Sequence, residues 1–331
     1  MAYDRGEQIR HFIVRQVEEY PADIAKVTAE KFSIEPAAVR WHLRQLASTD
    51  LVLEGKTRNR VYRLSASEWT KSYPLVAGLT EDSAWNDAAP VVGHLPENVL
   101  SIWNTGFTEM FNNAIDHSGG TEVAVKIRKT AINVEIEIVD NGVGIFKKVQ
   151  AAAKLPDERQ AILELTKGKF TTDSTKHSGE GIFFTSKMFD AFDITSGGLS
   201  FTGKRPPTVP AGTTVWMKLD NESIRLPADI YNAYSVDDFG FDKTNVPIKM
   251  AQFAGQRLVS RSQAKRVLAR IAEFKVALLD FAGVEMIGQA FADEIFRVFR
   301  NAHPEIPLEV VNATPDVAKM IRHVEAPHAE K

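Results

Sequence analysis

The sequence contains no cysteine, which excludes disulfides, thiolate metal sites and cysteine nucleophiles. It also lacks any apolar run near the ~18 residues of a membrane span, and its first ten residues lack the apolar core of a signal peptide. Neither sign of charge dominates, since 40 Lys and Arg residues stand against 43 Asp and Glu residues, a net charge of −3. We therefore expect a cytoplasmic protein with no membrane partner and no uniformly basic surface.

The chain has 331 residues, of which 44% are apolar and 25% charged, a composition typical of a soluble globular protein with two or three domains. The pattern of apolar residues predicts a multi-domain chain with α+β and α/β parts. The expected order is a first domain at 1–68, a connector at 69–95, a second domain at 96–222, a connector at 223–236 and a third domain at 237–327.

Three short helices followed by two short strands are expected in the first domain. The first helix carries apolar residues at helical spacing and stops before Pro21, and Pro36 suits the first position of the third helix. Strands at 51–53 and 61–64 bracket the polar tip 55–59, which is typical of a β-hairpin. This order of elements resembles that of winged-helix regulators, which implies a DNA-binding-like domain.

Local charge supports a DNA partner for this domain. Between Arg40 and Arg63 there are six basic residues and two acidic ones, a local charge of +4 in a chain whose net charge is −3. A winged helix contacts DNA with its third helix and its hairpin. The candidate DNA-binding residues are Arg40, Trp41, Arg44 and Gln45 on the helix and Lys56, Arg58 and Arg60 on the hairpin. The alternative is a winged helix used for protein contact or dimerisation.

The second domain begins with a strongly periodic helix at 100–115. Strands at 122–128 and 132–139 alternate apolar and polar residues, and further strands are expected near Ile194 and Val215. Helices are expected near 147–165 and up to Phe189. This order predicts an α/β sandwich with a mainly antiparallel sheet.

Four segments of the second domain carry chemistry. In the helix, Glu109 and Asn113 stand four residues apart on one face, which can hold a hydrated cation, although a solvated polar stripe would have the same pattern. A strand then ends in Asp140, and a returning strand is not expected after it, so a carboxylate facing a ligand is favoured over a hairpin. The remaining segments are Gly179 to Gly181, which opens a helix after a polar loop, and Gly212 to Val215, which enters a strand.

Together, over roughly 90–220, these segments resemble the GHKL ATPase superfamily, which includes gyrase, the Hsp90 chaperones, sensor histidine kinases and anti-sigma factor serine kinases. The resemblance implies a Bergerat fold that binds ATP and Mg²⁺. By motif, Asn113 matches the Mg²⁺ ligand, and Glu109 matches the carboxylate that orients or deprotonates the attacking group. Asp140 matches the residue that accepts from the adenine amino group, and His117 fits the family helix.

The glycines and Thr213 complete the resemblance. Gly142 and Gly144 match the glycines beneath the nucleotide, and Thr213 matches the threonine that supports adenine through water. Gly179 and Gly181 match the glycines of the phosphate lid. Three lysines of the lid are candidates to approach the γ-phosphate, with a solvated loop as the alternative: Lys167, Lys169 and Lys176.

The third domain alternates helices and strands, with a helix at 262–274, a strand at 276–281 and a helix near 290–299. The segment 278–293 resembles the central segment of STAS domains, the anti-anti-sigma fold, which implies a protein partner. Phosphorylatable STAS domains have a serine where this helix opens, whereas this chain has Gly288, Gln289 and Ala290 there. A packing module without a regulatory role is the alternative.

Two functions fit these resemblances. The first is a transcriptional or signalling regulator in which Mg-ATP switches the winged-helix and STAS-like domains. The second is a protein serine/threonine kinase of the anti-sigma factor type that acts in trans, with Glu109 as the base. A sensor histidine kinase is disfavoured because no histidine, His11 included, lies on a long dimerisation helix. The sequence leaves open whether ATP is hydrolysed and whether the chain forms a homodimer.

Overall fold

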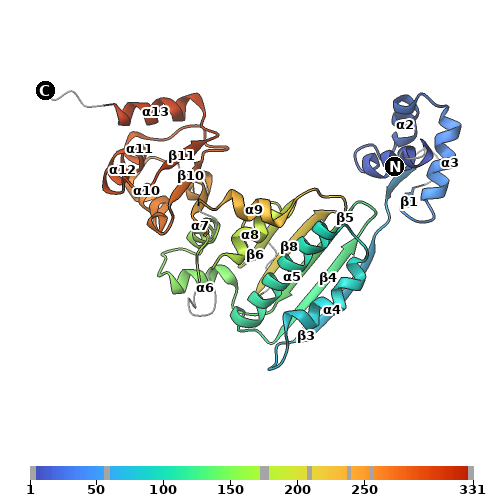
Figure 1. Ribbon diagram of the computed structural model, residues 1–331, viewed down its shortest axis with the longest axis horizontal. Helices are drawn as coiled ribbons and strands as arrows, with labels where there is room; N and C mark the ends of the chain where they lie inside the picture. The colour runs from blue at the N-terminus through green and yellow to red at the C-terminus, as the bar shows by residue number, and fades with distance from the viewer. Residues whose placement is uncertain are drawn as a thin grey trace.

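The computed structural model describes residues 5–55, 60–171, 179–206, 211–236, 240–252 and 257–326. Its N-terminal helices and its C-terminal α/β part lie at opposite ends of the long axis, with a six-stranded sheet between them (Figure 1). Within these ranges no helix is both long enough and apolar enough to cross a membrane. The molecule thus has three parts, which follow one another along the chain.

The N-terminal part consists of three helices and an antiparallel pair of strands. The left-handed conformation of Ser33 ends the second helix, and Pro36 begins the third, as expected from the sequence. Apolar side chains at helical spacing, such as Ile13, Val39 and Leu43, are fully buried against one another. The elements are α1 (Arg5–Gln16), α2 (Ile24–Phe32), α3 (Pro36–Leu46), β1 (Leu51–Glu54) and β2 (Val61–Leu64).

The central sheet has the order β3-β4-β5-β8-β6-β7, and all neighbouring strands in it are antiparallel. The mainly antiparallel sheet expected from the sequence is therefore confirmed. Its strands are β3 (Ser67–Pro74), β4 (Glu122–Lys129), β5 (Asn133–Asp140), β6 (Ala191–Ser196), β7 (Leu199–Ser200) and β8 (Thr213–Asp220). The helices of this part are α4 (Glu81–Val92), α5 (Glu97–His117), α6 (Ile145–Ala152), α7 (Arg159–Lys167), α8 (Gly181–Met188) and α9 (Pro227–Ala233).

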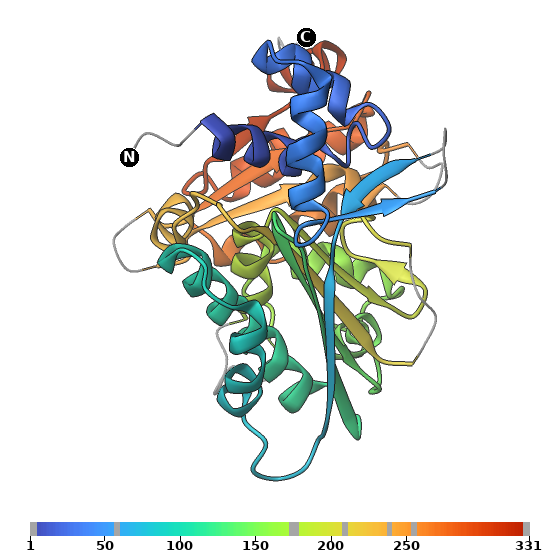
Figure 2. The same cartoon turned by 90° about the vertical axis from the view of Figure 1, so that its right-hand side faces the viewer.

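Residues 69–95 were expected to be a connector, but they form most of β3 and all of α4. β3 pairs with β4 from Ser67 to Pro74, and Figure 2 shows it leading from the N-terminal helices along the sheet. Pro74 is tolerated there because it ends an edge strand, where one side of the backbone needs no partner. Most of the Pro and Gly residues of this stretch therefore lie at the ends of elements, such as Pro74 and Gly93, although Pro90 lies inside α4.

Two further expectations in this part differ from the structure. The helix expected near 147–165 is split into α6 and α7, because Lys154 adopts a positive φ of 51° and Pro156 follows it. Residues 223–236 include α9. The ring of Tyr231 in this helix lies 4.5 Å from that of Phe184, and the ring of Tyr234, its C-cap, lies 4.8 Å from that of Phe183. The second connector is thus packed onto the central part through α8.

The C-terminal part contains a three-stranded parallel sheet of order β11-β10-β9. The helix expected at 262–274 ends at Leu268, because Arg270 adopts a left-handed backbone with a φ of 61°. The helix expected near 290–299 is present, although its second half is a π-helix. The elements are β9 (Lys243–Pro247), η2 (Ile248–Ala251), α10 (Arg261–Leu268), η3 (Ile271–Glu273), β10 (Val276–Asp280), α11 (Gln289–Asp293), η4 (Glu294–Phe299), α12 (Arg300–Ala302), β11 (Leu308–Val311) and α13 (Pro315–Glu325).

Ion pairs join the N-terminal part to the last strand of the central sheet. The guanidinium of Arg15 on α1 donates to both carboxylate oxygens of Asp220, which ends β8, and to Glu222 at 2.5 Å. The Nε2 atom of His11 lies 3.1 Å from the same Glu222 carboxylate. One end of the central sheet is therefore in direct contact with the first helix of the chain.

Candidate functional site

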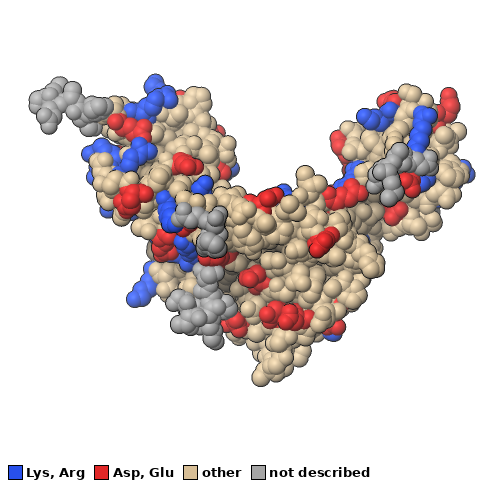
Figure 3. Space-filling view, viewed as in Figure 1, with Lys and Arg blue, Asp and Glu red and all other residues tan. Residues whose placement is uncertain are grey.

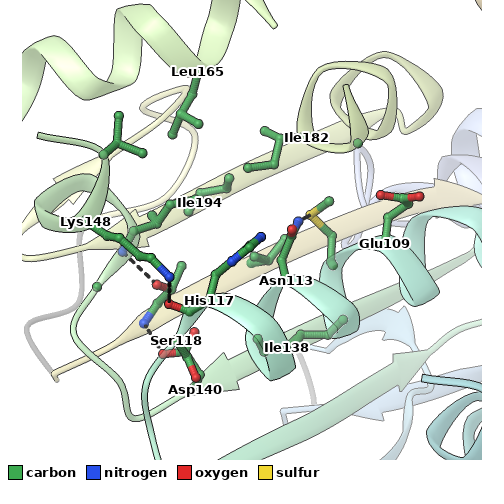
Figure 4. A pocket seen from close by; sticks show the side chains of 18 of the residues that line it. Glu109, Asn113, His117, Ser118, Ile138, Asp140, Lys148, Leu165, Ile182 and Ile194 are labelled. Carbon is green, nitrogen blue, oxygen red and sulfur yellow. Dashed lines mark hydrogen bonds between the residues drawn. The ribbon is translucent and has the colours of Figure 1, made fainter. Parts of the chain in front are cut away.

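A pocket lies between α5, the end of β5, the start of β8 and α8. It brings together eight of the nine residues that sequence motifs assigned to a nucleotide and its metal ion. Figure 4 shows Glu109, Asn113 and His117 along α5, with Glu109 at one end of the pocket and Asp140 at the other. The eight residues are Glu109, Asn113, His117, Asp140, Gly144, Gly179, Gly181 and Thr213.

The polar face of α5 follows from its sequence spacing. Glu109, Asn113 and His117 are each four residues apart and so fall on one side of the helix. The buried side of α5 carries large side chains such as Trp103 and Phe107, which fix the rotation of the helix. The Nδ2 atom of Asn113 contacts the sulfur of Met110 at 4.0 Å, which leaves the amide oxygen facing away from that sulfur.

Asp140 is held by backbone amides at the opposite end of the pocket. Its Oδ1 atom accepts from the N–H of Gly142 at 2.9 Å and from the N–H of Thr213 at 3.2 Å. Burial raises the pKa of the Asp140 carboxyl, and the hydrogen bonds from Gly142 and Thr213 oppose that rise. The hydroxyl of Thr213 also hydrogen-bonds this carboxylate, so a ligand would approach it on the side of Oδ2, which neither amide contacts.

Gly142 does not line the pocket, in contrast to the other motif glycines. A Cβ on residue 142 would overlap the carbonyl oxygen of Ser118, and the N–H of Val143 donates to that oxygen at 2.9 Å. Gly142 therefore packs the turn after β5 against the end of α5 and orients Asp140 through its amide. Thr213 has a similar structural task, since its hydroxyl accepts from the N–H of Ile145 at 3.0 Å.

Acidic groups gather where α8 begins. A Cβ on Gly181 would overlap the Oε2 atom of Glu109, so the carboxylate lies directly against the first residue of this helix. The pKa of the Tyr231 hydroxyl is raised by burial and further by the charges of Glu109 and Glu180. The backbone amides that open α8 can bind anionic oxygens, and the carboxylate of Glu109 lies next to them.

Lys148 is a pocket residue that sequence reasoning missed. Its ammonium donates to the carbonyl oxygen of His117 at 2.7 Å and so caps the end of α5. Burial lowers the pKa of Lys148, and the charge of Asp116 opposes this. The sequence carried one usable signal, since Lys148 follows the motif residue Gly144 by four residues, the spacing that places two residues on one side of a helix.

The lysines expected to approach a γ-phosphate point elsewhere or lie outside the described residues. The ammonium of Lys167 is fully buried and donates to Glu164 and to two backbone carbonyls of the C-terminal part. Lys169 donates to the carbonyl of Glu273 at 2.9 Å. Both side chains contact the C-terminal part instead of the pocket, and Lys176 lies outside the described residues.

The candidate DNA-binding residues on α3 form an exposed group. Figure 3 shows Lys and Arg side chains mainly on the N-terminal and C-terminal parts, whereas acidic side chains predominate on the visible face of the central part. The exposed candidates are Arg40, Trp41, Arg44 and Gln45 on α3 and Arg60 beside β2. The other two candidates, Lys56 and Arg58, lie outside the described residues.

The STAS-like segment is arranged as its sequence suggested. Gln289 begins α11, and Gly288 precedes it as the N-cap. The N–H of Gly288 donates to the carbonyl of Leu258 at 2.8 Å, so residues 258–260 lie beside this helix start. The hydroxyl of Ser260, the nearest along that stretch, caps α10 by accepting from the N–H of Gln263.

Comparison with known families agrees with two of these parts. Residues 104–223 match the family described as "Histidine kinase-, DNA gyrase B-, and HSP90-like ATPase". Residues 263–318 match a STAS-like domain of unknown function. A search of the curated proteins found no match. The chain therefore contains a GHKL-type ATPase domain, which implies nucleotide binding, and a STAS-like domain; neither match includes residues 1–103.

Proposed function

We propose that this protein is an ATP-dependent regulator, in which Mg-ATP bound between α5 and β8 changes how the N-terminal and STAS-like domains meet their partners. The observation that carries the proposal is the pocket itself. Asn113, the proposed cation ligand, and the carboxylate of Glu109 lie on α5. Asp140, the proposed hydrogen-bond acceptor for adenine, lies at the other end of the pocket. A nucleoside triphosphate needs that separation between its base and its phosphates.

The donor set fits a magnesium ion bound with phosphates. Mg²⁺ prefers oxygen ligands and keeps several waters, so it needs few protein groups beside the phosphate oxygens. The amide oxygen of Asn113 is the proposed protein ligand, and the ion would neutralise phosphate charge beside the acidic Glu109. Glu109 is proposed to orient the attacking hydroxyl or water beside the start of α8. Asp140 would accept from the adenine amino group through Oδ2, with Thr213 beside it.

The pocket is connected to both neighbouring domains. β8 starts at Thr213 in the pocket and ends at Asp220, which Arg15 of the N-terminal part binds. α7 lies between the pocket and the STAS-like domain, since Leu165 lines the pocket and Lys167 is buried against α10. A nucleotide would act by binding one arrangement of these contacts more tightly than another.

For the N-terminal domain we propose DNA as the partner. Arg40 and Arg44 are exposed one turn apart on α3, and within the described part of the chain neither side chain has an ion-pair partner. Unpaired guanidinium groups on an exposed helix suit phosphate and base contacts. For the STAS-like domain we propose a protein partner.

A kinase that acts in trans is the second candidate, favoured by the position of Glu109. A carboxylate at the phosphate end can activate a protein hydroxyl as readily as a water. The start of α11 offers Gln289 and no hydroxyl, so an acceptor at that place would have to be on another protein.

One set of measurements tests these proposals. Calorimetric titration of the full chain with ATP, with and without Mg²⁺, should give binding that depends on the metal ion. Absence of ATP binding would refute the proposal of an ATP-dependent regulator. Slow phosphate release without an acceptor favours the regulator. Mass spectrometry after incubation with Mg-ATP should detect no phosphate between 237 and 327, and stoichiometric phosphate there would favour the kinase.

A further inference from the structure

We propose that Arg270 of the STAS-like domain is a positioning residue for the nucleotide pocket. It holds the backbone of Gly168 and Lys169, and it thereby fixes Phe170, which lines the pocket. This inference rests on the proposed function, since it assigns a regulatory input to the same ATP site. The input comes from the STAS-like domain and acts through the segment 167–171.

The guanidinium of Arg270 contacts the segment in two ways: its edge donates hydrogen bonds to backbone carbonyls, and its face packs on the Phe170 ring. Its Nη2 atom donates to the carbonyl of Lys169 at 2.6 Å and to that of Gly168 at 3.4 Å. Its Cζ atom lies 5.3 Å from the centre of the Phe170 ring, a cation–π distance. The same side chain binds Glu273 at 2.7 Å and lies 3.5 Å from Glu164. The guanidinium thus joins α7, the segment and η3 in one hydrogen-bonded group.

The residues around Arg270 bind the same segment to the STAS-like domain. The hydroxyl of Thr244 donates to the carbonyl of Lys167 at 2.7 Å, and the Lys167 ammonium donates to the carbonyls of Arg266 and Ala269 at 3.0 and 2.7 Å. Lys169 lies 4.6 Å from the centre of the Phe274 ring. Each of these partners belongs to the C-terminal part. The segment therefore packs against that domain, although its position in the chain lies within the ATPase domain.

The other side of the segment belongs to the pocket. Phe170 and Thr171 line it together with Gly179 and Gly181. A Cβ on Gly179 would stand 2.6 Å from the carbonyl group of Phe170, so a glycine that matches the phosphate-lid motif packs on the backbone that Arg270 holds. A displacement of Phe170 would therefore change the wall of the pocket on the side of α8.

Arginine is suited to this task for two reasons. Its guanidinium has five donors in one plane, so it can bind the segment's carbonyls and the carboxylates of Glu164 and Glu273 while its planar face packs on the Phe170 ring, whereas the ammonium of lysine has three donors and no planar face. Its own backbone is left-handed, with a φ of 61°, a conformation that side-chain-bearing residues rarely adopt and that surrounding contacts must maintain. Glycine adopts this conformation without strain, so Arg270→Gly removes the side chain and leaves the backbone relaxed.

The experiment compares Arg270→Gly, Arg270→Lys and a matched control, Arg300→Ala, in the full chain. Arg300 pairs with Glu325 on the surface of the same domain, away from the segment. Calorimetry should find Mg-ATP affinity about tenfold weaker in Arg270→Gly, as expected for the loss of charge-assisted hydrogen bonds. The affinity of Arg270→Lys should lie between those of Arg270→Gly and the wild type, and the affinity of Arg300→Ala should equal that of the wild type. Circular dichroism confirms that each variant is folded.

Hydrogen exchange supplies a readout that a purely structural role would not change. Because coupling between two sites is reciprocal, Mg-ATP should slow amide exchange in 269–275 of the wild type. In Phe170→Ala that protection should be lost at saturating Mg-ATP. Affinity unchanged in both Arg270 variants, or protection retained in Phe170→Ala, would overturn the inference while the ATP site stands. A wild-type protein that does not bind Mg-ATP would overturn the proposed function and this inference with it.

Discussion

Gly181 and Glu109 come from different helices and meet so closely that a Cβ on residue 181 would overlap the Oε2 atom of the glutamate. The φ of Gly181 is not positive, so the glycine is needed for space and not for its backbone conformation. The absence of a side chain allows α8 to begin against the carboxylate on α5. The first amides of α8 and the proposed base therefore face the same phosphate position.

Gly181→Ala should weaken Mg-ATP binding about fivefold, because the added methyl group must push the Glu109 carboxylate towards the phosphate position or displace the start of α8. Inserting one methyl group into a tight contact costs about 1–3 kcal/mol, and the low end applies here because the overlapped atom ends a flexible side chain. Calorimetry on the double variant Gly181→Ala with Glu109→Ala is the control, since the new methyl group then has room. Binding that stays weak in the double variant would contradict this explanation.

Asn113→Ala and Glu109→Ala should have different effects. Removing the amide of Asn113 takes away the proposed protein ligand of Mg²⁺, so metal-dependent ATP binding should fall below detection in a calorimetric titration. Removing the Glu109 carboxylate should leave binding nearly intact and reduce turnover by roughly 10²- to 10⁴-fold, the usual contribution of a general base. Equal loss of binding in both variants would show that the two roles are misassigned.

The sequence motifs predicted which residues would lie close together more accurately than the sequence predicted where the elements around them begin and end. Glu109, Asn113 and His117 are four residues apart on a long periodic helix, and helical geometry alone places them on one face. Their proximity to Asp140 and Thr213 depends on the order of the sheet strands, which the motif resemblance implied and no local pattern could give. The role of Gly142 was hidden for the same reason, since Ser118 is its neighbour only in three dimensions.

Lys167 shows why the interdomain contacts were not foreseen. A lysine in a polar, glycine-containing loop is usually solvated, and the sequence suggested at most a phosphate contact. In the structure its ammonium is fully buried because Glu164 and two carbonyls of the STAS-like domain satisfy its three donors. Glu164 is one turn away on the same helix, but the two carbonyls belong to Arg266 and Ala269, which lie 99 and 102 residues further along the chain, so only the docked domain could identify them.

Asp140→Asn should reduce the preference of the protein for ATP over GTP by about tenfold or more. The proposed acceptor of the adenine amino group is Oδ2, and an amide in place of the carboxylate can present a donor at that position. The backbone donors of Gly142 and Thr213 would hold the remaining oxygen, so the fold should persist. Competition between the two nucleotides measures the preference, and an unchanged ratio would count against this adenine position.

Arg15→Ala should destabilise the protein at neutral pH by about 1–2 kcal/mol, because the variant loses charge-assisted hydrogen bonds to Asp220 and Glu222. Burial, the largest single influence, would raise the pKa of each carboxyl. The bonds and charge of Arg15, together with His11 and, for Asp220, the amide of Glu222, outweigh burial and lower both pKa values. Carboxyls with lowered pKa stabilise the folded state above their unfolded pKa of about 4, and this stabilisation is lost as the pH falls further.

Thermal unfolding of the wild type and of Arg15→Ala at several pH values measures this contribution. The difference in Tm between the two proteins should be largest near pH 7 and should shrink as the pH falls below about 4. A difference that grows on acidification would show that the two carboxylates are not the partners that matter.

Arg44→Ala should weaken DNA binding by the full chain and lower the slope of log K against log salt by about one, as expected for the loss of a single phosphate contact. The reason is the exposure of Arg44 on α3, one turn after Arg40, in the region of local positive charge. Arg300→Ala is the matched control, because Arg300 is a surface arginine of the STAS-like domain. A mobility-shift titration on mixed genomic fragments at several salt concentrations gives both quantities. If the wild type binds no fragment at low salt, the exposed face of α3, with Trp41 at its centre, is instead a surface for a protein partner.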